Sequence, residues 1–112
     1  MENIELLKQE LRDRYLLTYR ESKKFKYYPT AFLNMVTSGE DIVEVTRRLI
    51  HQRGGTDGFT RLFLEKRMDL SVERIMLEPR YRPLFSREDL QAAYSRLKEY
   101  QYDGLDEIEV PL

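Results

Sequence analysis

The sequence predicts an all-α protein, a compact bundle of five to six mostly short helices with a long N-terminal helix and an acidic C-terminal tail. Three observations predict this class. Apolar residues recur at the i, i+3, i+4 spacing of a helix face along most of the chain. No segment has the clean alternation of a half-buried strand. Gly and Pro stand where one periodic stretch gives way to the next, and so they mark helix ends.

The N-terminal helix is expected over residues 2–24, a stretch without Gly or Pro. One stripe of apolar side chains runs along it, and further apolar residues widen the stripe beyond what a single packing surface needs. We therefore predict contact with a protein partner, first of all a homodimer through residues 2–24. The alternative, in which the helix lies across its own domain, stays open. The candidate contact residues form the stripe itself: Ile4, Leu7, Leu11 and Tyr15.

A compact helical domain is expected over residues 25–102, between the N-terminal segment 1–24 and the tail 103–112. Tyr28-Pro29 marks the boundary after the N-terminal helix, because the residue before a proline avoids the helical region. A second helix is predicted over 29–36. Ser38 and Asp41 resemble a capping box that starts a third helix, which runs to about Gln52.

Residues 56–77 are predicted to be the centre of packing. Two short helices fit the apolar spacing around Phe59 and around Ile75, with a polar corner at 68–71 between them. At this corner we expect a buried clamp between two carboxylates, Asp69 and Glu73, and nearby arginines. An anion or phosphate site built from the same arginines is the alternative. These arginines are Arg61, Arg67 and Arg74.

The end of the chain is predicted from a second capping box and a change in charge. Ser86 and Asp89 start a last helix that runs to about Tyr100. Residues 101–112 hold four acidic side chains and no basic one, so their charge is −4 and the rest of the chain carries +3. We expect this tail to be dispensable for folding, although Ile108, Val110 and Leu112 alternate and could dock as an extended segment.

Composition excludes several kinds of site. The chain has no cysteine, which rules out disulfides, thiolate zinc sites, iron–sulfur ligation and a cysteine nucleophile. His51 is the single histidine, and it cannot form a typical zinc or haem site alone. The sequence has neither a secretory signal pattern nor an apolar run of membrane-spanning length. We expect a soluble, cytoplasmic protein with no metal, no cofactor and no membrane contact.

Polar motifs that could carry chemistry have simpler structural explanations. His51 stands near the end of the third helix, where the helix dipole favours a cation. The glycine-rich segment 54–58 lacks the Lys-Ser/Thr of a phosphate loop, and Gly54-Gly55 ends the third helix. The acid pairs Glu40-Asp41 and Glu88-Asp89 fall in first turns of helices, where negative charge is stabilising. We therefore predict no catalytic residue and no enzyme.

Nucleic-acid binding is the alternative function. Basic residues interleave with aromatic ones over 23–28, a pattern that can hold phosphates and stack bases. However, the net charge is −1, and no predicted helix is dominated by basic residues. The candidate nucleic-acid contacts are Lys23, Lys24, Lys26, Tyr27, Arg47 and Arg48.

Four motifs within residues 25–102 occur in one order. They are Tyr28-Pro29-Thr30-Ala31-Phe32-Leu33, Asp57-Gly58-Phe59-Thr60-Arg61-Leu62, Met68-Asp69-Leu70-Ser71-Val72-Glu73 and Pro83-Leu84-Phe85-Ser86. Together they resemble a family of small uncharacterised bacterial helical proteins. The resemblance implies a compact helical domain in a bacterial or mobile-element setting and implies no activity. The sequence as a whole favours a non-enzymatic protein-interaction module that acts as an adaptor, regulator or inhibitor.

The first testable prediction concerns the centre of packing. Phe59→Asp should place an unpaired charge in the core and unfold the domain, because such burial costs several kcal/mol. Thermal unfolding followed by circular dichroism measures this effect. A variant with the wild-type melting temperature would mean that the core lies elsewhere.

Overall fold

Six α-helices and three short 3₁₀ turns make up the part of the chain that the computed structural model describes, residues 3–53 and 55–112. No strand occurs among these residues, so the all-α class is confirmed. Glu2 and Gly54, which the sequence analysis placed at helix ends, lie outside the described residues. The helices are α1 (Ile4–Lys23), α2 (Thr30–Thr37), α3 (Ile42–Ile50), α4 (Asp57–Leu64), α5 (Val72–Met76) and α6 (Arg87–Glu99), and the turns are η1 (Met68–Leu70), η2 (Arg82–Leu84) and η3 (Leu105–Glu107).

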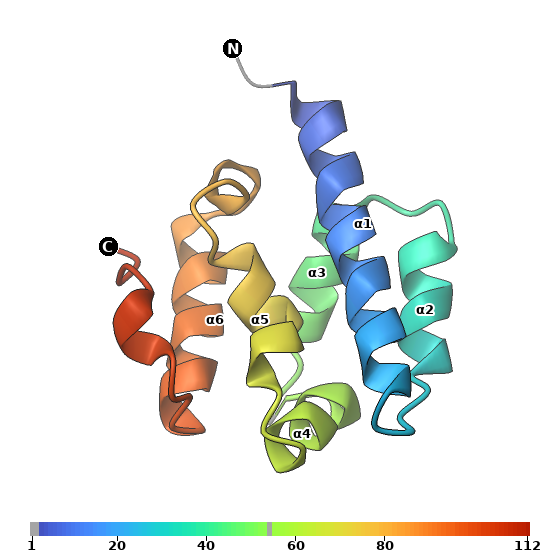
Figure 1. The fold of residues 1–112 in the computed structure, drawn as a ribbon. Coiled ribbons are helices and arrows are strands. Elements are labelled where there is room, and N and C mark those ends of the chain that lie inside the picture. The colour runs from blue at the N-terminus through green and yellow to red at the C-terminus, as the bar shows by residue number, and fades with distance from the viewer. Residues whose placement is uncertain (1–2, 54) are drawn as a thin grey trace.

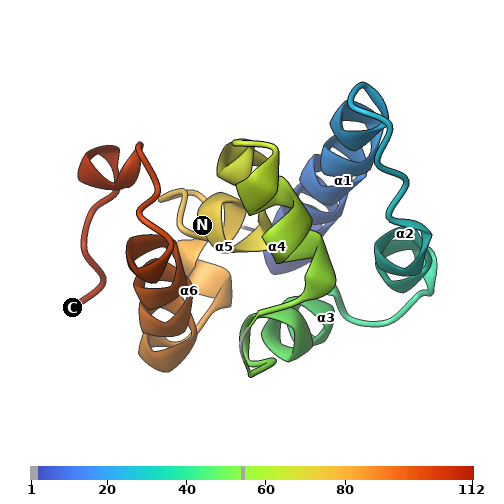
Figure 2. The same cartoon turned by 90° about the horizontal axis from the view of Figure 1, so that it is seen from below.

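Helix α5 lies at the centre of the bundle (Figure 1). It packs against α6, α3 and α1, and the turn η1 leads directly into it. Helices α1 and α2 lie side by side. The view from below places α3 on the side of the molecule away from the C-terminal end of α1 (Figure 2). The predicted centre of packing at residues 56–77 thus supplies six residues of the core cluster, but only its second helix, α5, lies in the middle of the bundle, whereas α4 lies at its lower end (Figure 1).

One of the two predicted capping boxes is confirmed. At the start of α6, Ser86 and Asp89 exchange side-chain and backbone hydrogen bonds as a capping box does. At α3 the prediction is wrong, because Asp41 is itself the N-cap and Ser38 ends α2. Gly39 between them has φ of +89°, a left-handed conformation that turns the chain before α3 can begin.

Helix α1 belongs to the hydrophobic core of its own domain. Leu7, Leu11 and Tyr15 are 1%, 0% and 0% exposed, and they share one core cluster with residues of the other five α-helices. Three of the four predicted contact residues are therefore not on the surface, and only Ile4 is exposed. An apolar stripe has the same pattern whether it faces its own domain or a partner, so the sequence could not distinguish the two.

The apolar side chains that remain on the outer face of α1 are not contiguous. Leu6 and Leu17 are the exposed ones on that face. They lie about 16 Å apart along the helix axis at roughly 1.5 Å per residue, and Asp13 is exposed between them. The predicted homodimer through residues 2–24 thus lacks a continuous apolar surface.

The acidic tail packs against the body of the molecule, which differs from the loose tail expected from the sequence. Ile108 is 7% exposed and joins the core cluster. Arg82 Nη2 donates a hydrogen bond to the backbone oxygen of Glu109 at 2.6 Å, and Arg87 Nε donates to that of Leu112 at 2.5 Å. The tail is held by backbone acceptors and by the apolar side chains of Leu105, Ile108 and Pro111, so its acidic character gave no sign of docking.

We expect the docked tail to contribute to stability. Ile108→Ala should lower the free energy of unfolding by about 2–4 kcal/mol, because it removes buried methyl groups and leaves a cavity. Deletion of residues 103–112 should lower it further. Val110→Ala, at a position that is 52% exposed, is the control and should change little. Urea unfolding measures all three, and a truncated chain with wild-type stability would show that the tail is not anchored.

Candidate binding cavity

A cavity of about 300 Å³ opens to the surface between α1, α2 and α4. Its inner wall comes from the C-terminal half of α1 and from the junction of η1 and α5. Its outer rim includes Ala31, Gln52 and Asp57, which line the cavity and are exposed. The volume is at the lower limit of ordinary ligand sites, about 300–1,000 Å³. This space is therefore large enough to hold a chemical group and too small for an extended ligand.

Local backbone geometry places Tyr27 in the cavity wall. Lys26 follows the end of α1 in the left-handed conformation, with φ of 62°. The N–H of Tyr27 then donates to the backbone oxygen of Ser22 at 3.0 Å, as at the end of a helix that closes with a left-handed residue. This turn reverses the chain and directs it toward Pro29 and α2.

Gly58 allows α4 to approach the loop after α1 closely. A Cβ atom on Gly58 would lie 3.2 Å from the hydroxyl oxygen of Tyr27, a tighter contact than nearly all real side chains make. Thr56 caps α4 through a hydrogen bond that its Oγ1 accepts from the N–H of Phe59 at 3.0 Å. The cap and the glycine together fix the distance between the two sides of the cavity.

The hydroxyl groups in the inner wall are already used within the protein. Thr18 Oγ1 donates to the backbone oxygen of Leu70 at 2.8 Å, and Ser22 Oγ donates to that of Thr18 at 2.8 Å. Ser71 Oγ donates to the backbone oxygen of Met68 at 2.7 Å. These hydroxyls offer no free proton to a ligand, so the cavity presents mainly apolar surface. That surface comes from Phe32, Met35, Leu49, Phe59, Leu62 and Val72.

One buried ion pair stands beside the cavity. Glu73 lines the cavity and is 3% exposed, and its Oε2 lies 3.2 Å from Nη1 of Arg96 on α6. Nη2 of Arg96 also donates to the backbone oxygen of Gln52 at 3.1 Å. Burial raises the pKa of Glu73 above its usual value, although its own backbone N–H and Arg96 act in the opposite direction.

The predicted carboxylate–arginine clamp is therefore present in part. Glu73 is the buried acid, but its arginine is Arg96, which lies far along the chain. Arg67 pairs with Asp69 at 3.1 Å, as expected, but this pair lies on the surface, and Arg61 pairs with Glu65 at 2.9 Å. The expected arginines were those close to Glu73 along the chain, whereas a buried carboxylate pairs with the guanidinium that the fold brings to it.

Arg61 also covers Tyr27. Its guanidinium carbon lies 5.0 Å from the centre of the Tyr27 ring. Burial raises the pKa of the Tyr27 hydroxyl, with the Arg61 charge acting in the opposite direction. One side of the Tyr27 ring is thus occupied by Arg61 and the ring forms part of the cavity wall, so Tyr27 is not the free stacking platform expected for a base.

His51 ends α3, as predicted, and forms a contact that the sequence did not reveal. Its Nε2 lies 2.8 Å from Oδ1 of Asp89 in the capping box of α6. Burial acts to raise the pKa of Asp89, but hydrogen bonds from His51 and Ser86 outweigh it and hold the pKa below its usual value. This contact joins α3 to α6 and lines no part of the cavity.

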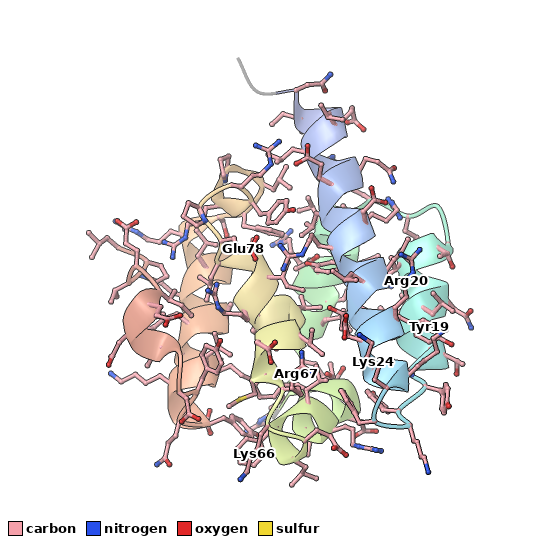
Figure 3. All side chains as sticks on the ribbon, viewed as in Figure 1. Tyr19, Arg20, Lys24, Lys66, Arg67 and Glu78 are labelled. Atoms are coloured by element: carbon pink, nitrogen blue, oxygen red, sulfur yellow. The ribbon has the colours of Figure 1, made fainter. Side chains whose placement is uncertain are left out.

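The structure separates the predicted nucleic-acid contacts. Lys23, Lys24 and Lys26 lie around the end of α1, whereas Arg47 and Arg48 lie on α3, on the far side of the bundle (Figure 2). Arg47 contacts Glu44 and Asp89, and Arg48 contacts Glu40. A different basic group lies on one face, where Figure 3 shows residues of α1 above residues of the turn after α4: Arg20, Lys24, Lys66 and Arg67.

Neither a metal cluster nor a membrane span is found in the described part of the chain. Residues 3–53 and 55–112 contain no group of three or more His, Asp or Glu side chains placed to hold a metal ion. Within the same ranges, no helix is both long enough and apolar enough to cross a bilayer. Comparisons with family models, with curated proteins and with solved structures give no match to this chain.

Residues from three of the four sequence motifs line the cavity. Its walls include residues from the motifs at 28–33, 57–62 and 68–73. From the sequence, Phe59 was expected in the core, and no cavity was predicted. The sequence did show three motifs in a fixed order. Only the fold shows that these motifs, which are far apart along the chain, line one cavity.

Replacing Arg96 tests the buried pair. Arg96→Leu should lower the free energy of unfolding by about 3–5 kcal/mol at neutral pH, because it leaves a buried carboxylate without a counter-charge. The pKa of Glu73, already raised, should rise further, so the folded state binds a proton more readily than the unfolded state. The loss of stability should therefore shrink as pH falls through this raised pKa.

Urea unfolding of Arg96→Leu at a series of pH values measures this dependence. Arg20→Leu, on the exposed face of α1, is the matched control and should change stability little at any pH. A loss of stability in Arg96→Leu that does not vary with pH would contradict a charged Glu73 as its cause.

Proposed function

We propose that this protein is a non-enzymatic protein-interaction module whose docking site is the cavity, where one apolar side chain of a partner protein is anchored. The observation that carries the proposal is the cavity itself, a space of about 300 Å³ that opens at the surface between α1, α2 and α4. Binding energy at protein interfaces is concentrated in a few anchor side chains that fill such spaces.

Its size supports a side chain over a free metabolite. Small-molecule sites extend from about 300 to 1,000 Å³ and bury most of their ligand. A cavity at the lower end of that range, open at one side, fits a single anchor whose backbone stays outside. The exposed rim on α2 and at the start of α4 would then lie under the partner's chain.

The polar groups of the cavity also support binding over catalysis. The three inner hydroxyls donate to backbone carbonyls, and Glu73 is paired with Arg96. His51, the chain's single histidine, is bonded to Asp89 away from the cavity. Each of these groups thus has a structural role. An adaptor, regulator or inhibitor role, a bacterial or mobile-element setting and a cytoplasmic location stay predictions from the sequence.

Nucleic-acid binding is the second candidate, and the observation that favours it is the basic group on the face shown in Figure 3. Arg20 on α1, Lys24 directly after α1 and Lys66 after α4 could contact phosphates. Such binding would weaken steeply with salt. A labelled single strand or duplex titrated at two salt concentrations tests it, with Arg20→Ala/Lys66→Ala as the variant expected to bind more weakly.

Closing the mouth of the cavity tests the first proposal. Peptides selected from a random display library on the wild-type protein should share one large apolar residue. Their affinity should fall by about tenfold or more for Ala31→Trp, equivalent to ~1.4 kcal/mol, because the new indole occupies the opening. Fluorescence anisotropy with the selected peptides measures the affinity.

The matched control is Ser95→Trp, which places the same side chain at an exposed position on α6, outside the cavity. It should leave the affinity unchanged. Selected peptides that bind Ala31→Trp as tightly as the wild type would contradict docking in the cavity.

A further inference from the structure

The exposed rim of the cavity carries one acidic side chain. Asp57, in the first turn of α4, is exposed and lines the cavity. The other acidic residue of the lining is Glu73, which is buried and paired with Arg96, so its charge is balanced within the protein. None of the described residues that line the cavity is basic. The unbalanced charge of the lining is therefore negative and lies at the rim.

The Asp57 carboxylate is unpaired within the described part of the chain. It forms no ion pair and accepts no hydrogen bond from residues 3–53 or 55–112. Arg61 is placed one turn further along α4, at the i+4 position, but it is engaged elsewhere. Its Nε lies 2.9 Å from Glu65, and its Nη2 donates to the backbone oxygen of Phe25 at 3.4 Å. The accepting sites of Asp57 are thus free for a partner.

The position of the Asp57 carboxylate follows from its effect on Tyr27, which lines the cavity. Burial raises the pKa of the Tyr27 hydroxyl, Arg61 acts in the opposite direction, and the negative charge of Asp57 adds to the rise. A charge has such an effect only on a group close to it. Gly58, the residue after Asp57, approaches the same hydroxyl, since a Cβ atom added to it would lie 3.2 Å away. Asp57 therefore stands beside the cavity wall.

A partner whose anchor fills the cavity must carry its chain across this rim. Protein interfaces have an apolar centre and a polar rim, and the charges of the two partners at the rim are complementary. The exposed polar residues of the rim are Gln52 and Asp57, of which Asp57 alone is charged. A basic residue next to the anchor meets an unpaired carboxylate there, whereas an acidic residue meets a like charge.

We infer that the cavity binds a segment of a partner protein in which a Lys or Arg lies within about three residues of the apolar anchor, roughly 10 Å of extended chain, and that Asp57 pairs with this cation. The inference rests on the proposed function and adds the chemistry of the partner. Exposed ion pairs are weak, so the anchor supplies most of the affinity. Asp57 determines specificity, because it selects the sign of the charge beside the anchor.

A double-mutant cycle on the full chain tests the pair. The probes are the peptides selected on the wild-type protein, each synthesised with its Lys or Arg and again with Gln in that place. Loss of the cation should weaken binding to the wild type by about two- to fivefold and binding to Asp57→Asn hardly at all. The wild-type preference should also disappear in 1 M salt, where charges are screened beyond about 3 Å. Fluorescence anisotropy measures each affinity.

Reversing the charge gives a second test. Asp57→Lys should invert the preference, so that peptides with Glu beside the anchor bind more tightly than those with Lys. Glu88→Lys is the matched control, because Glu88 is also an exposed acid in the first turn of a helix, α6, and does not line the cavity. Both changes remove a charge that the helix dipole favours. Only Asp57→Lys should alter which peptides bind best.

The outcomes separate this inference from the proposed function. Cavity-bound peptides that lack a basic residue near the anchor, or that lose nothing when it becomes Gln, would overturn the inference and leave docking of an apolar side chain intact. Peptides that ignore Ala31→Trp would overturn both. A wild-type dimer that Ala31→Trp converts to a monomer in light scattering would make a second copy the occupant and overturn the inference. If Asp57→Asn does not fold, the wild-type preference and its loss in salt decide.

Discussion

The buried ion pair between Glu73 and Arg96 is the interaction on which the rest of the structure depends. Two charges removed from water are tolerated only when they are well paired and further hydrogen-bonded, and Arg96 meets this demand by also donating to the backbone oxygen of Gln52. Its guanidinium lies 6.0 Å from the centre of the Phe59 ring. A Cβ atom added to Gly55, which has φ of +85°, would lie 3.5 Å from the same side chain. One arginine of α6 thereby positions α5, α4 and the end of α3.

This constraint explains how a helix as short as α5 can form the centre of a protein. A helix of five residues has little stability of its own in water. Here Ile75 and Met76 are 1% and 0% exposed, so packing on its neighbours supplies the stability. Tyr15 adds a second connection, because its hydroxyl is 2.8 Å from Oγ1 of Thr46 and so joins α1 to α3. Two elements that bound the cavity, α1 and α5, are therefore held in place by contacts with other helices.

The chain's many charges serve the fold more than they form a charged surface. Arg12 donates to the backbone oxygens of Val36 and Glu40 at 2.5 and 3.2 Å, and so satisfies carbonyls at the end of α2 and in the turn after it. Arg82 and Arg87 hold the tail in a similar way. Charged residues make up 35% of the sequence. Because several arginines donate to backbone oxygens within the domain, the number of arginines in the sequence is a poor measure of affinity for a polyanion.

The sequence by itself determined the all-α class, the approximate helices, the capping box at Ser86 and the contribution of residues 56–77 to the core, because these follow from local spacing and local hydrogen bonds. It also determined that Glu73 belongs to a carboxylate–arginine pair. Only the tertiary structure decided that Arg96 is the partner, that the α1 stripe faces inward, that the tail docks through Ile108, and that three motifs enclose one cavity. These features depend on which distant segments meet, and a periodic pattern states that a face is apolar without stating what covers it.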